Sequence, residues 1–149
     1  MKKKIVILGS TGSIGKTTFS ILKKNKNFFN IKLLTTNRNI KELIKQSKTF
    51  NVKNLIVTDK KQFLIAKKIL KNKKINIFNN FNSLNKIFKK KVDYTMSSIS
   101  GFEGLEPTLN MIRFSKKIAI ANKEAIICAW SLIRKEMTKN NTNFIPIDS

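Results

Sequence analysis

The chain has 149 residues, a length that suits one domain with a single hydrophobic core. Hydrophobic residues make up 41% of it and charged residues 26%, and this balance excludes a disordered chain. The formal charge of +23 would suit a nucleic acid partner, but lysine and asparagine are spread along the whole sequence, as compositional drift of a coding sequence also produces. We therefore expect no nucleic acid partner.

Short apolar runs rich in β-branched residues alternate with longer stretches of helical period. The runs predict strands at 4–8, 31–35, 54–58, 75–78, 92–96, 117–121 and 143–147, with helices between them and a long helix from about Lys123. The first helix, over 13–24, is predicted to place Ile14, Thr18, Ile21 and Leu22 on its apolar face, and the third Phe63, Ile65, Ala66, Ile69 and Leu70. This alternation predicts an α/β fold of the Rossmann-like, doubly wound kind, a mainly parallel sheet of about seven strands with helices on both faces.

The sequence also bears on where the protein resides. No apolar run approaches the roughly 20 residues of a membrane helix, and the one behind the basic N-terminus is too short for a secretory signal. Cys128 is the only cysteine, so no disulfide can form within the chain, and its apolar neighbours Ile127 and Trp130 favour a buried thiol. We expect a cytoplasmic protein with no membrane partner.

A glycine-rich segment, GSTGSIG, follows the first predicted strand and opens the first predicted helix. A nucleoside-triphosphate loop needs a glycine five positions before its Gly-Lys-Thr, and here that position holds Ser10. Gly9, Gly12 and Gly15 instead fit the turn, the close approach to a pyrophosphate and the helix packing of a dinucleotide fold. The segment therefore predicts an anchored dinucleotide.

The start of the first helix adds further groups that can bind phosphate. A helix that begins at Ser13 directs its free N–H groups and positive end toward the pyrophosphate, and Thr11 and Ser13 can add hydroxyl donors. Lys16 is then expected to face solvent instead of taking part in catalysis.

The residues after the second predicted strand indicate which dinucleotide is bound. NAD-dependent enzymes usually carry a carboxylate there, whereas this chain reads TTNRN over 35–39. Arg38 can meet a 2′-phosphate with its guanidinium and Asn39 with its amide, so we expect NADP and not NAD. The alternative is an ordinary basic loop in a basic protein.

Four segments of the sequence stand out together. They are GSTGSIG at 9–15, TNRN at 36–39, SGFEGLEPTL at 100–109 with ANKE at 121–124, and PIDS at 146–149. These segments resemble the family of 1-deoxy-D-xylulose 5-phosphate reductoisomerase, an NADPH enzyme of isoprenoid biosynthesis. The resemblance covers essentially the whole chain. It implies that 1-149 form an NADP-binding domain and that the family's catalytic and C-terminal domains are absent from this chain.

The resemblance also implies roles for individual residues. Gly9, Thr11, Gly12, Ser13, Ile14 and Gly15 would hold the NADPH phosphates, and Asn37, Arg38 and Asn39 the adenosine end. Asn122 and Glu124 would lie beside the nicotinamide, and Lys123 would contact the substrate and stabilise developing oxyanions. Asp148 would be the first ligand of an Mg²⁺, Mn²⁺ or Co²⁺ ion, and Ser149 a substrate contact.

For the complete enzyme the resemblance implies a phosphosugar substrate, a metal-assisted rearrangement, a hydride transfer to 2-C-methyl-D-erythritol 4-phosphate, and a homodimer. One aspartate is too small a ligand set for a divalent cation, so we expect no turnover from this chain alone. Two alternatives stay open, a non-catalytic NADP-binding module and a basic nucleic-acid-binding domain.

Overall fold

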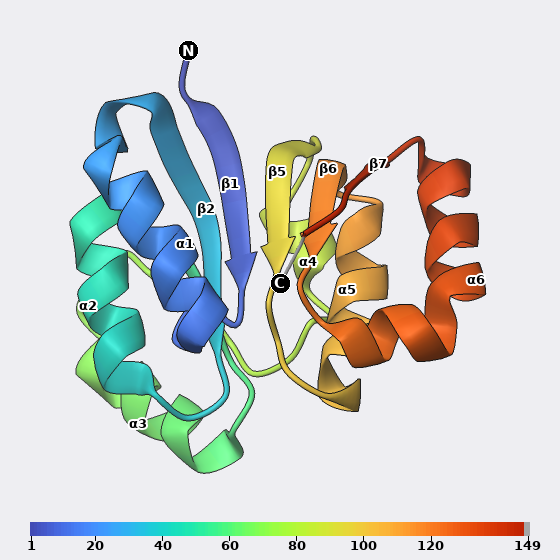
Figure 1. Ribbon diagram of the computed structural model, residues 1–149. Helices are drawn as coiled ribbons and strands as arrows, with labels where there is room; N and C mark the ends of the chain where they lie inside the picture. The colour runs from blue at the N-terminus through green and yellow to red at the C-terminus, as the bar shows by residue number, and fades with distance from the viewer. Residues whose placement is uncertain (148–149) are drawn as a thin grey trace.

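The computed structural model describes residues 1–147, which form a seven-stranded sheet between two layers of helices (Figure 1). The strands are β1 (Lys3–Leu8), β2 (Phe29–Thr36), β3 (Asn54–Val57), β4 (Asn76–Phe78), β5 (Val92–Ser97), β6 (Ser115–Ile120) and β7 (Asn143–Ile145). Their order across the sheet is β4-β3-β2-β1-β5-β6-β7, and each neighbouring pair is parallel. The predicted Rossmann-like sheet of seven strands is confirmed.

The helices divide between the two faces of the sheet because the crossovers change direction after β4. They are α1 (Ser13–Lys24), α2 (Ile40–Phe50), α3 (Lys60–Ile69), α4 (Leu84–Ile87), α5 (Leu105–Ile112) and α6 (Lys123–Asn140), with short 3-10 helices η1 (Lys26–Phe28) and η2 (Phe102–Gly104). In Figure 1, α1, α2 and α3 lie to the left of the sheet, and α4, α5 and α6 to the right. Right-handed crossovers in opposite directions produce this division.

Strand β1 shows why a parallel sheet reads as an uninterrupted apolar run. Ile5 and Ile7 pack into the core under α1 and α2, while Val6 and Leu8 pack into the core under α4 and α5. Because helices cover both faces, successive side chains are buried alternately on opposite sides. A third cluster, centred on Ile118, Ile120 and Ile133, joins β6 to α5 and α6.

The predicted apolar face of α1 was wrong for two of its residues. Ile14 and Ile21 are exposed, and Gly15, Phe19 and Leu22 are the buried residues of the helix. The helix is turned in this way because Gly15 lies directly against the backbone of the glycine segment. In α3 the same error affects Ile65 and Ile69, which are exposed, whereas Ala66 and Leu70 are buried.

The predicted burial of Cys128 was also wrong, since its thiol is exposed. The residue lies in α6 next to Ala129, whose φ of −135° interrupts the helix. Ile127 and Leu132 are exposed as well, while Trp130 packs edge-on against Phe144. Apolar neighbours in sequence therefore do not form a buried face here.

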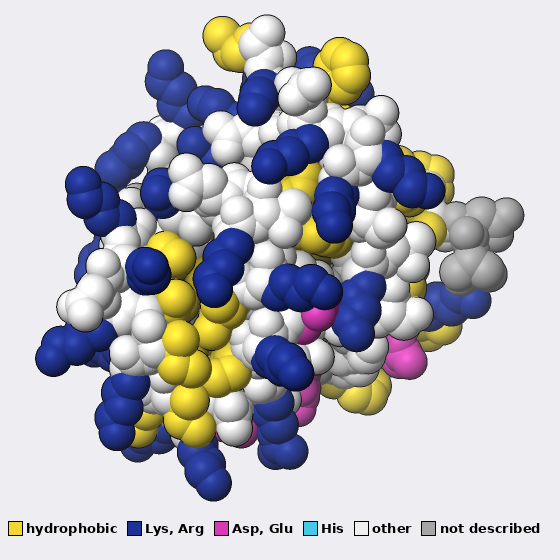
Figure 2. Space-filling model, turned by 90° about the vertical axis from the view of Figure 1, so that its left-hand side faces the viewer, with side chains coloured by type: hydrophobic (Ala, Val, Ile, Leu, Met, Phe, Trp, Pro, Cys, Tyr) yellow, Lys and Arg dark blue, Asp and Glu magenta, His cyan; other side chains and the backbone are white. Residues whose placement is uncertain are grey.

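The surface charge is dispersed over the face that Figure 2 shows, where Lys and Arg side chains alternate with apolar and neutral groups. One of the few carboxylates, Asp93, accepts hydrogen bonds from the N–H of Lys4 at 2.8 Å and from the Lys116 ammonium at 3.2 Å. The Lys4 N–H, followed by Lys116, holds the pKa of Asp93 below its usual range. Within the described part of the chain, no helix has the length and apolar character needed to cross a membrane.

Candidate functional site

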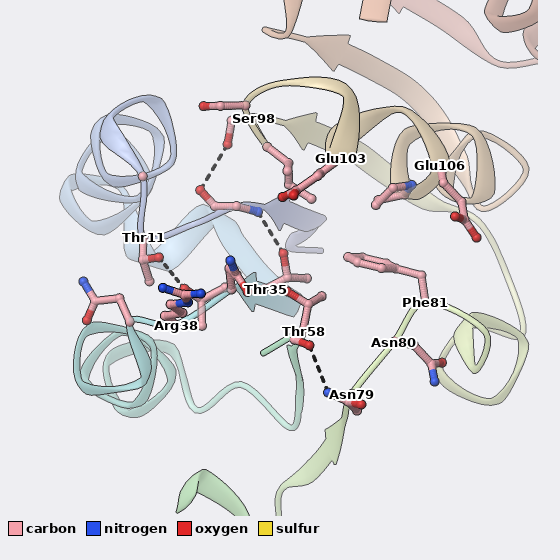
Figure 3. A pocket seen from close by; sticks show the side chains of 18 of the residues that line it. Thr11, Thr35, Arg38, Thr58, Asn79, Asn80, Phe81, Ser98, Glu103 and Glu106 are labelled. Carbon is pink, nitrogen blue, oxygen red and sulfur yellow. Dashed lines mark hydrogen bonds between the residues drawn. The ribbon is translucent and has the colours of Figure 1, made fainter. Parts of the chain in front are cut away.

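A cleft of about 840 Å³ opens at the carboxyl edge of the sheet, where β1 and β5 lie side by side. The chain leaves these two strands toward opposite faces of the sheet, and such a switch point is where open α/β sheets bind ligands. The cleft is lined by residues at or after the ends of β1, β2, β3, β4 and β5, and Figure 3 shows several of them gathered around the same space. The lining residues are Gly9, Thr11, Gly12, Thr35, Thr36, Asn37, Arg38, Asn39, Thr58, Asn79, Asn80, Phe81, Asn82, Ser98, Ile99, Ser100, Glu103, Glu106 and Pro107.

Gly9 makes the turn at the end of β1. Its φ of 75° lies in the left-handed region that side chains disfavour, and an added Cβ would lie 3.0 Å from the Ser98 carbonyl oxygen. Its N–H donates to Thr35 Oγ1 at 2.8 Å, and the next N–H, of Ser10, donates to the Thr35 carbonyl at 2.9 Å. The turn is therefore fixed between β2 and β5.

Gly15 and Gly12 differ in the space around them. A Cβ on Gly15 would lie 2.6 Å from the Cα of Ser10 and closer still to the Gly9 carbonyl oxygen, so α1 packs here with no room for a side chain. A Cβ on Gly12 would meet only the Gly9 carbonyl oxygen, at 3.6 Å. The packing role predicted for the third glycine is confirmed, and Gly12 leaves open space beside the cleft.

The N-terminus of α1 begins next to this space. Gly12 is the N-cap residue, and among residues 1–147 no side chain caps the helix. The free N–H groups of the first turn and the positive end of the helix are suited to an anion. Thr11 Oγ1 shares a hydrogen bond of 2.5 Å with Thr36 Oγ1, which ties the segment to the end of β2 (Figure 3). Lys16 is exposed, as predicted.

Arg38 lines the cleft from the loop after β2, and its side chain is 78% exposed. Its Nε donates to Asp59 Oδ2 at 3.2 Å, a carboxylate that the sequence did not indicate because it follows β3. Asp59 also caps α3 by accepting the Gln62 N–H at 2.9 Å. The Gln62 N–H has the larger effect and Arg38 a smaller one, and both lower the pKa of the Asp59 carboxyl below its usual value. The negative charge of Asp59 is thus largely compensated by Arg38 and the Gln62 N–H.

Two asparagines flank Arg38 and use their carbonyl oxygens locally. Asn37 Oδ1 accepts from the Thr58 hydroxyl at 3.1 Å, and Asn39 Oδ1 caps α2 by accepting the Glu42 N–H at 3.2 Å. Both residues line the cleft. The loop after β2 is therefore held by β3 on one side and by α2 on the other.

Asn122 is 4% exposed and does not line the cleft. Its Nδ2 donates to the carbonyls of Ile99, at 2.8 Å, and Gly101, and its Oδ1 accepts the Ala125 N–H at 3.1 Å. The side chain thereby caps α6 and clamps the loop after β5 to it. Gly104 packs against this clamp, because a Cβ there would lie 2.8 Å from Asn122 Nδ2.

The structure gathers only some of the predicted site residues in the cleft: Gly9, Thr11, Gly12, Asn37, Arg38 and Asn39. Ser13 and Ile14 are exposed in the first turn of α1, and Lys123 and Glu124 are exposed in the first turn of α6. Asp148 and Ser149 lie outside the described residues. Among residues 1–147, no group of three or more His, Cys, Asp or Glu side chains could hold a metal ion.

Several cleft residues were missed in the sequence. The segment 79–82 follows the edge strand β4, and Ser98 to Ser100 follow β5. Glu103 points into the cleft from η2 (Figure 3), and Glu106 of α5 also lines it. For segments 79–82 and 98–100 the available signal was position, because each comes just after a predicted strand of a parallel sheet. Glu103 and Glu106 lie within SGFEGLEPTL, a segment that carries part of the family resemblance.

The strand order, the switch-point cleft and the three-glycine turn place the chain in the Rossmann-like class of α/β proteins. The family model for 1-deoxy-D-xylulose 5-phosphate reductoisomerase matches residues 5–130. The chain belongs to this family.

Individual relatives agree with the family assignment. The reductoisomerase of Pelagibacter ubique is 60% identical over 149 residues, which are 99% of this chain and 38% of that protein. A solved reductoisomerase from Zymomonas mobilis in complex with NADPH is 30% identical with a TM-score of 0.89, over 99% of this chain and 39% of that one. A reductoisomerase in complex with NADPH, fosmidomycin and magnesium gives a TM-score of 0.89 at 27% identity, over 99% and 36%. The chain thus spans well under half the length of these relatives.

Proposed function

We propose that this chain binds NADPH in the switch-point cleft. The observation that carries the proposal is that the glycine turn, the uncapped N-terminus of α1 and Arg38 all border one space. The first two suit a pyrophosphate, because N–H groups and the positive end of a helix attract anions. The open space at Gly12 fits the group, since a ligand phosphate could approach the backbone there.

Arg38 supports NADP over NAD. Its Nε is occupied by Asp59, but the terminal nitrogens of the planar guanidinium can still form a fork with a phosphate. Asp59 would normally disfavour a second anion nearby. Its two oxygens accept from the Gln62 N–H and from Arg38, so much of that charge is already compensated.

For the complete family protein we propose the reductoisomerase reaction, conversion of 1-deoxy-D-xylulose 5-phosphate to 2-C-methyl-D-erythritol 4-phosphate. NADPH would supply the hydride when bound. Lys123 and Glu124 stand exposed at the start of α6, where Lys123 could contact an anionic substrate and Glu124 the nicotinamide. Asn122 would act on the cofactor indirectly, through the loop that it clamps.

The described residues do not form a site for the divalent metal. Residues 1–147 offer no fitting ligand cluster, and Asp148 is outside them, so we derive no metal-dependent step for this chain. The assignment of Asp148 and Ser149 to metal and substrate stays a prediction from the resemblance. The same holds for one NADP-binding domain over 1-149, for the homodimer and for the cytoplasmic location.

The proposal can be tested by calorimetric titration of the chain with NADPH and with NADH. We expect NADPH to bind more tightly, and Arg38→Gln to remove most of that preference while leaving NADH binding unchanged. Arg134→Gln is the matched control, because it removes the same charge from an exposed position on α6 outside the cleft. Equal losses in both variants would mean that general charge attraction, as for a nucleic acid, explains the binding, and no binding by the unmodified chain would refute the proposal.

A further inference from the structure

The segment after β4 forms one wall of the cleft without any role assigned so far. Asn79 fixes its start, donating from Nδ2 to the Val57 carbonyl at 2.9 Å and to the Thr58 carbonyl at 3.2 Å. Within the segment, the Asn82 N–H donates to Asn80 Oδ1 at 2.9 Å. The wall is therefore attached to β3 and folded on itself instead of projecting freely into solvent.

Phe81 is the one aromatic side chain that lines the described cleft. It is half-buried and packs against the core cluster that contains Leu33, Ile56 and Leu84. Figure 3 shows its ring extending from the segment toward the middle of the cleft, with Thr35 and Thr58 opposite. A half-buried ring with polar neighbours is a firm, flat surface that a planar ligand group can cover.

The strand order determines which half of a dinucleotide reaches this ring. The strands β2, β3 and β4 lie on one side of β1, and β5 lies on the other. Arg38 follows β2, so the phosphorylated ribose and its base belong to the side that holds Phe81. The end of β4 is two strands from β2, about 10 Å at the usual strand spacing of about 4.8 Å, and the Phe81 ring is directed from that end toward the middle of the cleft (Figure 3).

We infer that Phe81 is a specificity-determining residue that stacks on the purine base of the cofactor. The inference rests on the proposed NADPH function and extends it to a residue that the glycine turn does not include. Asn79, Asn80 and Asn82 line the same cleft with neutral amides, which suit the edge of a base better than a phosphate. Stacking on an aromatic ring recognises a base by its flat face.

The test compares Phe81→Leu, which keeps apolar bulk but removes the aromatic plane, with Phe81→Trp, which keeps a plane. The ligands are NADPH, adenosine 2′,5′-bisphosphate and reduced nicotinamide mononucleotide, each titrated by calorimetry. We expect Phe81→Leu to weaken NADPH and the bisphosphate by the same factor, roughly 5- to 100-fold, which is the range for loss of one base–aromatic stack. Phe81→Trp should bind both within about threefold of the unmodified chain.

A matched control is Phe28→Leu, since Phe28 is 68% exposed in η1 and does not line the cleft. Circular dichroism on each variant separates lost binding from lost folding, and Phe81→Trp supplies the test if Phe81→Leu does not fold. Equal NADPH affinities for Phe81→Leu and the unmodified chain would refute the stacking role alone. The same role would be refuted if Phe81→Leu bound NADPH and reduced nicotinamide mononucleotide more weakly but bound the bisphosphate as tightly as the unmodified chain does. An unmodified chain that binds none of the ligands would refute the proposed function and the stacking role together.

Discussion

Gly15→Ala should destabilise the fold, because the added methyl group has no space. The new Cβ would lie 2.6 Å from the Cα and 2.8 Å from the carbonyl carbon of Ser10, and closer still to the Gly9 carbonyl oxygen. All three atoms belong to the backbone of a turn that is hydrogen-bonded to β2, so no side chain can rotate away. The helix itself must move, and with it Phe19 and Leu22.

Two opposing effects set how far Gly15→Ala lowers the free energy of unfolding. Overpacking of this kind costs about 1–3 kcal/mol, and the rigid backbone on the far side favours the upper end. Alanine gains about 1 kcal/mol over glycine in a helix. The free energy of unfolding should therefore fall by about 2 kcal/mol, a substantial part of a typical stability of about 5–15 kcal/mol.

Urea denaturation followed by circular dichroism measures this difference. With a slope near 2 kcal/mol per molar urea, the midpoint should fall by about 1 M. Gly12→Ala is the control, because its Cβ meets the nearest atom at 3.6 Å and should cost about 1 kcal/mol or less. Gly12→Ala should nevertheless weaken NADPH binding at least tenfold if a pyrophosphate lies over that residue. Equal urea midpoints for Gly15→Ala and the unmodified chain would refute the steric reasoning.

Three further outcomes are expected. Asn122→Ala should lower the free energy of unfolding by about 2–3 kcal/mol in urea, since it removes the cap of α6 and leaves two carbonyls without their donor. For Asp93, whose pKa is lowered by the Lys4 N–H and then by Lys116, the stability it contributes is present above the unfolded pKa of about 4 and disappears as the pH falls through the lower folded value. Urea midpoints measured across this acid range should therefore fall less steeply in Asp93→Asn than in the unmodified chain. The chain alone should show no turnover of 1-deoxy-D-xylulose 5-phosphate when NADPH absorbance is followed, and a steady decline would contradict its expected inactivity.

The sheet was predictable because each strand of a doubly covered parallel sheet is a short, nearly continuous apolar run. β1 was predicted at 4–8 and is found at Lys3–Leu8, and β5 was predicted at 92–96 and is found at Val92–Ser97. The faces of the helices were harder to predict. In α1 the apolar Ile14 and Ile21 misled the prediction, because the contact of Gly15 with the turn decides the rotation of the helix.

The site was predictable only where its residues form a continuous segment. The glycine turn and Arg38 were found in this way. The partner of Arg38, Asp59, is 21 residues away, and the loop between β2 and α2 meets it only in the folded sheet. Segment 79–82, with its three asparagines, resembled a solvated connection in sequence, and only the strand order shows that it borders the cleft.

The walls of the cleft are held in place by hydrogen bonds between segments that are far apart in the sequence. Thr35 accepts a hydrogen bond from Gly9 in the turn after β1, and Thr36 shares one with Thr11 in the same segment. Asn122 donates to the loop after β5. Each bond joins a loop to a neighbouring strand or to the loop that follows another strand, so the walls are fixed before any ligand arrives. Prior ordering lowers the entropy that binding must overcome, and affinity then depends on a few exposed groups. Substitutions in this supporting layer should therefore weaken binding of both halves of the dinucleotide together, whereas Arg38 and Phe81 should affect the adenosine half alone.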